Sequence, residues 1–198
     1  MAKGLALFDL DGTITKSDTF IEFIRYTKGD IAFVAGFGIL SPALIAMKLK
    51  MIPNWRAKEI TLSWFFGGMP VDEFNRRCGA FSDARMDALV RPGAKKQIEW
   101  HKQQDHTVYI VSASAENWLK KWCAEQDIHL LATRLIVENG RITGKLDGRN
   151  CYGEEKVSRI KEAIRLEDYE TIWAYGDSSG DKQMLALTQN ATYKPFRT

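Results

Sequence analysis

Two hydrophobic patterns alternate along the second half of the chain. Short continuous apolar runs, which are typical of buried strands, are separated by stretches in which apolar residues recur with helical spacing. The runs predict strands at 5–9, 106–114 and 171–177, and a hairpin over 130–148. The helical patterns predict helices at 94–104, 116–127, 153–166 and 180–188. Strands that alternate with helices predict an α/β fold with a Rossmann-like parallel sheet.

The segment 17–90 breaks this alternation, because it shows helical patterns and no strand pattern. Its first helix should stop at Gly29. Later helices should begin at Pro53 and Pro70, since proline suits a first helical turn. The sequence therefore predicts an all-helical cap at 17–90, inserted into an α/β core built from 1–16 and 91–198.

The uncharged stretch Ile31–Met47 is the most apolar part of this insertion. Our preferred interpretation is a pair of buried helices that are broken at Ser41-Pro42. A surface that meets a membrane or a lipid-like substrate is an alternative. A membrane span is a third interpretation, although the stretch is slightly shorter than the usual ~20 residues.

Composition narrows the classes of function. The chain has 198 residues, of which 45% are hydrophobic and 27% charged, and a net charge of +3 with acids and bases mixed. This balance is typical of a globular protein and gives no reason to expect a nucleic-acid partner. Three widely spaced cysteines without a CxxC pair favour free thiols in a reducing compartment, so we expect a cytoplasmic protein with potential peripheral membrane association. The oligomeric state stays open.

Polar residues follow the predicted strands, where open α/β sheets bind their ligands. Asp9 and Asp11 end the first strand, and Ser112 ends the second. Asp177 follows the last strand, and Lys156 lies in the first turn of the helix before it. Each residue alone is more often a helix cap or a solvated side chain. Their predicted meeting at one edge of one sheet favours a functional site.

These residues belong to segments that resemble a known set of motifs. The segments are "FDLDGT" at 8–13, "VSAS" at 111–114, "GEEK" at 153–156 and "GDSSGD" at 176–181. In this order they are similar to the four motifs of the haloacid dehalogenase (HAD) superfamily of phosphotransferases. The helical insertion and the "NGRITGKL" hairpin resemble its phosphoserine-phosphatase-like branch, subfamily IB. The resemblance implies the HAD fold.

The resemblance also implies a phosphatase that forms an aspartyl-phosphate. Asp9 would attack phosphorus, and Asp11 would protonate the leaving oxygen and then deprotonate water. Because nucleophile and phosphate are both anions, a cation must bridge them, and Mg²⁺ suits carboxylates and phosphate. Its expected ligands are Asp9, Asp177 and, through its carbonyl, Asp11. The remaining expected roles are phosphate binding by Gly12, Thr13, Ser112, Ala113 and Lys156, and support of Lys156 or metal-bound water by Asp181.

The substrate is less well defined than the reaction, and we expect a small soluble phosphomonoester. Phosphoserine is an alternative, although phosphoserine phosphatases have a Ser where this chain has Gly12 and a Glu where it has Asp18. They also carry Gly-Gly where this chain has Ala113 and Ser114. Asp18 and Arg56 are our candidate specificity residues, although a surface salt bridge is the commoner use of such an arginine.

Two further alternatives remain open. The apolar insertion favours a lipid phosphate of the phosphatidylglycerophosphate type, admitted through a membrane-facing cap. The chain could instead be a non-catalytic regulator that binds phosphate or Mg²⁺.

Overall fold

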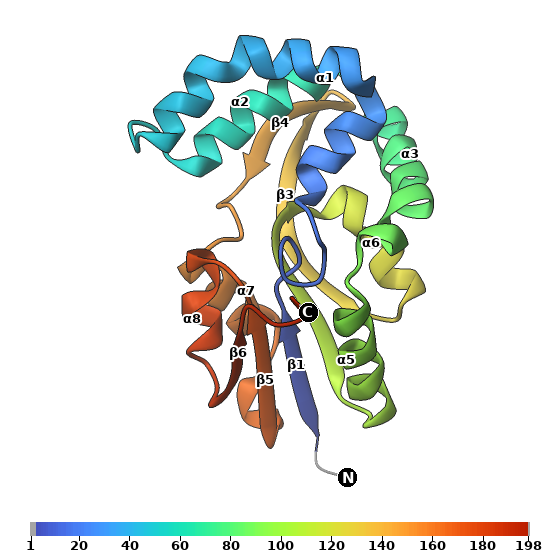
Figure 1. The fold of residues 1–198 in the computed structure, drawn as a ribbon, viewed down its shortest axis with the longest axis vertical. Helices are drawn as coiled ribbons and strands as arrows, with labels where there is room; N and C mark the ends of the chain where they lie inside the picture. The colour runs from blue at the N-terminus through green and yellow to red at the C-terminus, as the bar shows by residue number, and fades with distance from the viewer. Residues whose placement is uncertain (1–2, 198) are drawn as a thin grey trace.

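A six-stranded sheet forms the centre of the fold in the computed structural model, which describes residues 3–197 (Figure 1). The strand order is β4-β3-β2-β1-β5-β6, and every neighbouring pair is parallel except β3 and β4. The strands are β1 (Gly4–Phe8), β2 (Thr107–Ala115), β3 (His129–Glu138), β4 (Arg141–Asp147), β5 (Thr171–Gly176) and β6 (Asn190–Tyr193). The predicted strands and hairpin are confirmed. The sequence did not predict β6, because this strand is short, exposed and carries no apolar run.

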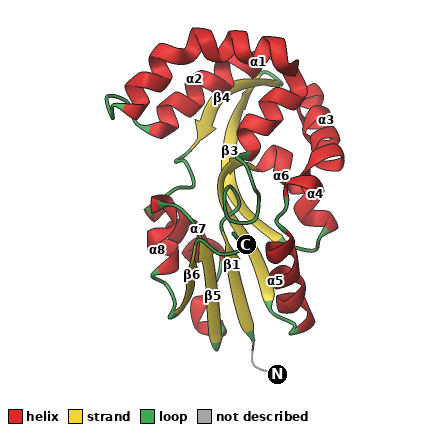
Figure 2. Ribbon diagram, in the orientation of Figure 1, coloured by secondary structure: helices red, strands yellow, loops and turns green. Residues whose placement is uncertain are grey.

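Helices cover both faces of the sheet, as Figure 2 shows. The covering helices are α5 (Pro92–Gln103) and α6 (Glu116–Glu125) on one face, and α7 (Glu154–Ala163) and α8 (Lys182–Leu185) on the other, with short turns η2 (Leu166–Asp168) and η3 (Ser179–Asp181). The central strand β1 is fully buried and sends alternate side chains to the two faces. Phe8 joins the core beneath α5 and α6, whereas Leu7 joins the core with Ile160 of α7 and Met184 of α8.

The segment between β1 and α5, called the helical insertion below, lies across one end of the sheet (Figure 1). It contains α1 (Thr19–Lys48), α2 (Asn54–Phe66), α3 (Val71–Phe81), the π-helical turn η1 (Ser82–Met86) and α4 (Asp87–Leu89). Pro53 and Pro70 directly precede α2 and α3, as predicted. Phe23 of α1 packs on Phe66 and on Trp118 of α6, and thereby joins the insertion to the core.

The β3–β4 hairpin reaches from the sheet into the helical insertion. Its tip forms backbone hydrogen bonds with the α2–α3 connection, from Gly68 N to Ile142 O and from Ile142 N to Met69 O. Gly144 of β4 has φ +80°, and a Cβ there would lie 2.4 Å from the Ser63 backbone of α2. Only glycine permits this close approach. The layer over the end of the sheet therefore consists of the helical insertion together with the β3–β4 hairpin of the core.

The predicted break at Ser41-Pro42 is wrong, because helix α1 runs through Pro42. Proline removes the amide that would bond to the carbonyl four residues earlier, which here belongs to Gly38. The Ser41 hydroxyl donates to that Gly38 carbonyl at 2.7 Å instead, so the carbonyl keeps a partner. The predicted stop at Gly29 is confirmed, because its φ of 77° and ψ of 165° are not helical and divide α1 into two helical parts at a kink.

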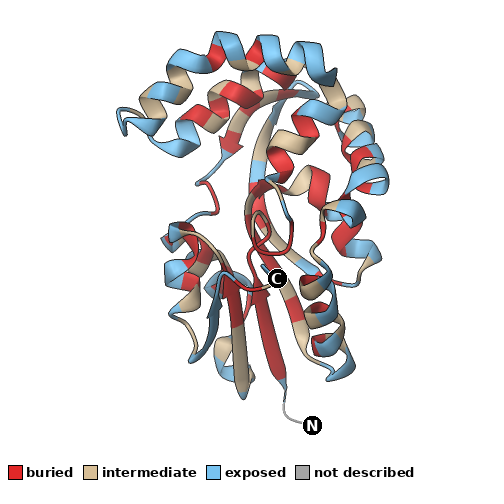
Figure 3. Cartoon of the chain, in the orientation of Figure 1, coloured by how far each residue is buried: buried red, intermediate tan, exposed pale blue. Residues whose placement is uncertain are grey.

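The expectation that Ile31–Met47 is buried is also wrong. Ile31 is 90% exposed and Val34 is 68% exposed, whereas Gly36 and Leu40 are buried (Figure 3). By length and composition, α1 is the one helix among residues 3–197 that could cross a membrane. Its apolar residues are thus only partly explained by packing within the chain.

Candidate active site

The carboxyl ends of β1, β2 and β5 bring the predicted polar residues together. Asp9 directly follows β1, and Asp177 directly follows β5, the neighbour of β1. Lys156 lies in the first turn of α7, and Ser112 lies within β2 on the other side of β1. Strand order changes direction next to β1, at the place where α/β sheets form ligand-binding crevices.

Lys156 is the buried charge at the centre of this crevice. Its Nζ lies 2.7 Å from Asp9 Oδ1 and 2.8 Å from Asp181 Oδ1, and it donates to the Val111 carbonyl at 2.5 Å. Lys156 and Asp181 are each 1% exposed and Asp9 is 7% exposed. A charge this deeply buried requires ionic partners. The Asp9 and Asp181 carboxylates are the partners of the Lys156 ammonium, and the ammonium is the partner of both carboxylates.

The two carboxylates that hold Lys156 differ in their proton affinity. Burial raises the pKa of Asp9 to about 7, although the Lys156 charge opposes this rise. Burial also acts to raise the pKa of Asp181, but the charge of Lys156 and hydrogen bonds from Lys156 and Ser178 hold it below its usual value. Burial acts to lower the pKa of Lys156, yet the two carboxylates outweigh it and raise that pKa. The ammonium therefore stays charged.

A carboxylate cluster capable of holding a metal ion lies beside Lys156. Asp9, Asp177 and Asp181 offer oxygens that all lie within 4.8 Å of one another. Asp181 Oδ2 accepts hydrogen bonds from the Asp177 and Ser178 amides, which fixes the loop after β5. Gly12 passes close to this loop with φ +87°, and a Cβ there would lie 2.6 Å from Asp177 Oδ2. The positive φ favours glycine at this point of the β1 loop, and a side chain there would displace the Asp177 carboxylate.

Arg197, near the end of the described chain, also reaches the cluster. Its Nη2 lies 2.6 Å from Asp177 Oδ2. The preceding Phe196 packs near Phe8 and Tyr175, which anchors the segment over the sheet. The sequence analysis did not single out Arg197, because no local pattern relates it to Asp177.

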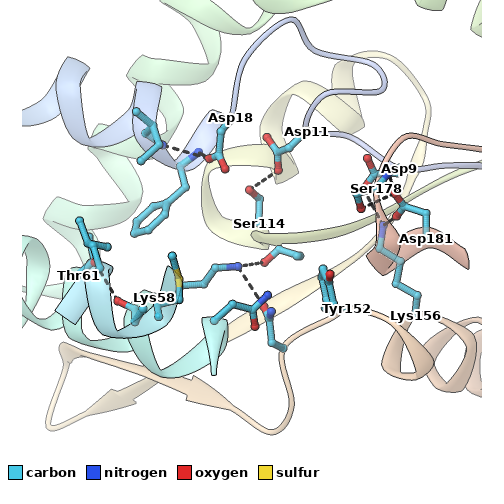
Figure 4. Close-up of a pocket in the computed structure, with 18 of the residues that line it drawn as sticks. Asp9, Asp11, Asp18, Lys58, Thr61, Ser114, Tyr152, Lys156, Ser178 and Asp181 are labelled. Carbon is cyan, nitrogen blue, oxygen red and sulfur yellow. Dashed lines mark hydrogen bonds and ion pairs between the residues drawn. The ribbon is translucent and has the colours of Figure 1, made fainter. Parts of the chain in front are cut away.

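Asp11 points away from the metal-type cluster. Its Oδ1 accepts from the Thr19 amide at 2.6 Å, and its Oδ2 accepts from the Ser114 hydroxyl at 2.7 Å (Figure 4). Thr19 is the first residue of α1, and its hydroxyl lies 3.0 Å from the Ser114 hydroxyl and 3.2 Å from Trp118 Nε1. The insertion and β2 together therefore fix the carboxyl group of Asp11.

Asp18 lines the same cavity but also caps helix α1. Its Oδ1 accepts from the Phe20 and Ile21 amides. Burial and the nearby charge of Asp11 raise the pKa of Asp18 to about 6. Asp18 thus has a structural role as the cap of α1, whether or not it also contacts substrate.

The predicted phosphate-binding residues lie around the first two motifs. Ser112 is fully buried, and its Oγ accepts from the Ser114 amide, which leaves the hydroxyl proton available to an acceptor. Thr13 is also fully buried, and its hydroxyl has no hydrogen-bond partner among residues 3–197. Buried polar groups normally have partners, so the Thr13 hydroxyl is a donor available to a ligand oxygen.

A cavity of about 340 Å³ extends from Asp9 and Lys156 to the helical insertion (Figure 4). Lys58 of α2 reaches into it, and its Nζ donates to the Ala113 carbonyl at 2.8 Å and to Asn150 Oδ1 at 3.1 Å. Burial lowers the pKa of Lys58, and the charges of Asp18 and Asp11 oppose that fall.

Comparison with known proteins identifies the family of this chain. Residues 6–186 match the haloacid dehalogenase-like hydrolase family. The chain belongs to this family. It is 34% identical to Protein CicA of Caulobacter vibrioides over 98% of this chain and 86% of that protein. It is 26% identical to a phosphoserine phosphatase of Methanocaldococcus jannaschii over 92% of this chain and 81% of that protein. A protein of unknown function from Bordetella pertussis has the same fold, with a TM-score of 0.80, 21% identity, and coverage of 96% of this chain and 89% of that one.

In this haloacid dehalogenase-like hydrolase, most predicted site residues meet but not all line the cavity. The lining includes Asp9, Asp11, Asp18, Ala113, Lys156 and Asp181. The predicted residues outside the lining are Gly12, Thr13, Arg56, Ser112 and Asp177. The half-exposed guanidinium of Arg56 pairs with Glu59 at 3.1 Å. Sequence reasoning missed Lys58. The signal available was helical spacing, because the α2 residues in the lining are Asn54, Ala57, Lys58 and Thr61.

The Lys156 ion pairs predict a pH-dependent loss of stability in Lys156→Met. Without the ammonium, two buried carboxylates lose their partner, which should cost about 3–5 kcal/mol near neutral pH. The pKa of Asp9 should then rise further above its unfolded value. A raised native pKa means that stability is lost as pH increases, so the deficit should be larger at pH 8 than at pH 5.

Urea unfolding of the variant at both pH values measures this deficit. Lys161→Met, an exposed lysine on the same helix, is the matched control and should stay close to wild type. An equal deficit at both pH values would contradict the assigned coupling.

Proposed function

We propose that this protein is a Mg²⁺-dependent phosphatase that hydrolyses a phosphomonoester through an aspartyl-phosphate on Asp9. The observation that carries the proposal is the grouping of Asp9, Lys156 and the Asp177–Asp181 loop at one end of the central strand. The named phosphoserine phosphatase among the relatives supports the same reaction class. A non-catalytic regulator would have no use for the separately positioned Asp11 carboxyl group.

The donor set around Asp9 fits Mg²⁺. Asp9 and Asp177 would be side-chain ligands, and the Asp11 carbonyl would assist them. Their hard oxygen atoms, with substrate phosphate and water, match the preference of Mg²⁺ rather than that of zinc. When bound, the ion would neutralise charge between the nucleophile and the phosphoryl group. Asp181 would act indirectly, since it holds both Lys156 and the Asp177 loop.

The first step would form an Asp9–phosphorus bond and break the bond from phosphorus to the leaving oxygen. Lys156 touches Asp9 Oδ1, so it would favour the ionised nucleophile against burial, which raises the pKa of Asp9 to about 7. It would also stabilise negative charge on the transferring group. Asp11 would give its proton to the leaving oxygen. Thr19 N–H and the Ser114 hydroxyl would hold the Asp11 carboxyl group for this transfer.

The second step would release phosphate and restore Asp9. Asp11, now ionised, would accept a proton from water while the water oxygen attacks phosphorus. The Asp9–phosphorus bond breaks, and Asp9 regains its carboxylate. Ser112, Thr13 and the backbone at Gly12 and Ala113 would bind the phosphoryl oxygens through both steps.

A phosphomonoester with a small leaving group fits the cavity volume of about 340 Å³. Phosphoserine is supported by the relatives, but Asp18 would have to serve its amine while it caps α1. Arg56 would not serve its carboxylate from outside the cavity lining. The proposed reaction is therefore broader than phosphoserine hydrolysis.

Asp9→Asn should abolish Mg²⁺-dependent phosphate release, because the amide is a poor nucleophile and a poor metal ligand. The measurement is phosphate release from p-nitrophenyl phosphate, with circular dichroism to confirm the fold. Asp72→Asn, on the exposed side of α3, is the matched control and should keep full activity. A fully active Asp9→Asn enzyme would end the proposal.

Arg197→Ala should tighten Mg²⁺ binding, since the guanidinium occupies an oxygen of a proposed metal ligand. The pair is partly exposed, so we expect the Mg²⁺ concentration for half-maximal thermal stabilisation to fall about two- to fivefold. The test is a Mg²⁺ titration followed by the melting temperature, with Arg134→Ala as the control. Weaker Mg²⁺ binding in Arg197→Ala would show that the arginine supports the site instead.

A further inference from the structure

The cavity above Asp9 has two ends of different chemistry. The end next to Asp9 carries the charged side chains of the proposed reaction, including Asp11, Lys156 and Asp181. The other end lies between α1 and α2. Its apolar lining residues are Phe20, Ile21, Phe37, Leu44, Met47 and Ala57.

Several polar groups near the apolar end are already engaged. The Thr61 hydroxyl donates to the Ala57 carbonyl at 2.8 Å. Lys58 bends toward the charged end, where its ammonium donates to Ala113 and Asn150. Asp18 uses one carboxylate oxygen as the α1 cap. A polar leaving group would depend on the second Asp18 oxygen and on Asn54, whereas a hydrocarbon chain would meet six apolar residues.

The apolar wall is incompletely covered within the chain. Phe37, Leu44 and Met47 of α1 are only partly buried. Within the uncharged Ile31–Met47 stretch, the buried residues are Gly36 and Leu40. Partly exposed apolar surface beside a catalytic crevice gains stability when a ligand covers it. A leaving group attached to a phosphate at Asp9 would meet this wall, because Asp9 and the apolar residues line the same cavity.

We propose that the substrate is a phosphomonoester whose leaving group carries an aliphatic chain that binds between α1 and α2. This inference rests on the proposed phosphatase function and assigns its substrate class. Asn150 supports it at the junction of the two ends. Its buried Nδ2 has no hydrogen-bond partner among residues 3–197, so it offers a donor to a polar atom between phosphate and chain.

The test is a chain-length series on wild-type protein with Mg²⁺. Ethyl, butyl, hexyl and octyl phosphate are compared as monomers, with phosphoserine as the polar substrate. Each buried methylene should raise kcat/KM by up to about fourfold until the apolar end is filled. Phosphoserine should fall near or below ethyl phosphate.

A variant pair on α1 locates the effect. Leu44→Gln should lower the octyl-to-ethyl ratio of kcat/KM by about tenfold or more, because it places an amide in the apolar end. Ile45→Gln changes the adjacent, 57% exposed residue and should leave that ratio unchanged. If Leu44→Gln does not fold, the wild-type series alone decides the question.

The outcomes separate this inference from the function on which it rests. A flat chain-length profile in an active enzyme overturns the inference and leaves the phosphatase intact. Failure to hydrolyse any phosphomonoester overturns the proposed function and the inference with it. Phosphatidylcholine vesicles that contain phosphatidate identify the source of the chain. If wild-type protein hydrolyses phosphatidate in the vesicles and Ile45→Gln does not, the substrate is a bilayer lipid. If only the monomeric alkyl phosphates are hydrolysed, the substrate is a soluble amphiphile.

Discussion

The ion-pair group of Lys156, Asp9 and Asp181 is the constraint on which the rest of the site depends. A buried ammonium is costly unless partners surround it, and here two carboxylates and a carbonyl do so at 2.5–2.8 Å. These contacts tie α7 to the carboxyl end of β1 and to the loop after β5. The ion pairs that stabilise the buried ammonium in the folded protein therefore also influence the charge on the proposed nucleophile, Asp9.

The helical insertion completes this site from the opposite side. The α1 N-terminus supplies the Thr19 amide to Asp11, and α2 supplies Lys58 to the cavity. The β3–β4 hairpin bonds to the α2–α3 connection and holds the insertion over the sheet. The core thus carries the proposed reacting groups, while the insertion orients Asp11 and forms the wall that a leaving group would contact.

Much of the fold and charged site could be predicted because both depend on local sequence. Apolar runs define the buried strands, and polar residues that follow parallel strands must meet at one edge, as Asp9 and Asp177 do. The residues that were missed depend on long-range geometry. Lys58 required knowledge of which α2 face meets the sheet, and the Ser114–Asp11 contact joins residues 103 positions apart. Pro42 misled the prediction because a single Ser41 hydrogen bond repairs the helix it would otherwise break.

In the proposed reaction, Asp9 carries the phosphoryl group during turnover. Replacing Asp11 by Asn removes the base for the second step, so the aspartyl-phosphate should accumulate with a substrate that has a good leaving group. Acid quenching of Asp11→Asn with p-nitrophenyl phosphate and Mg²⁺, followed by peptide mass spectrometry, measures this directly. We expect one added phosphoryl group on the peptide that contains Asp9. A phosphoryl group on another residue, or turnover at the wild-type rate without any adduct, would contradict it.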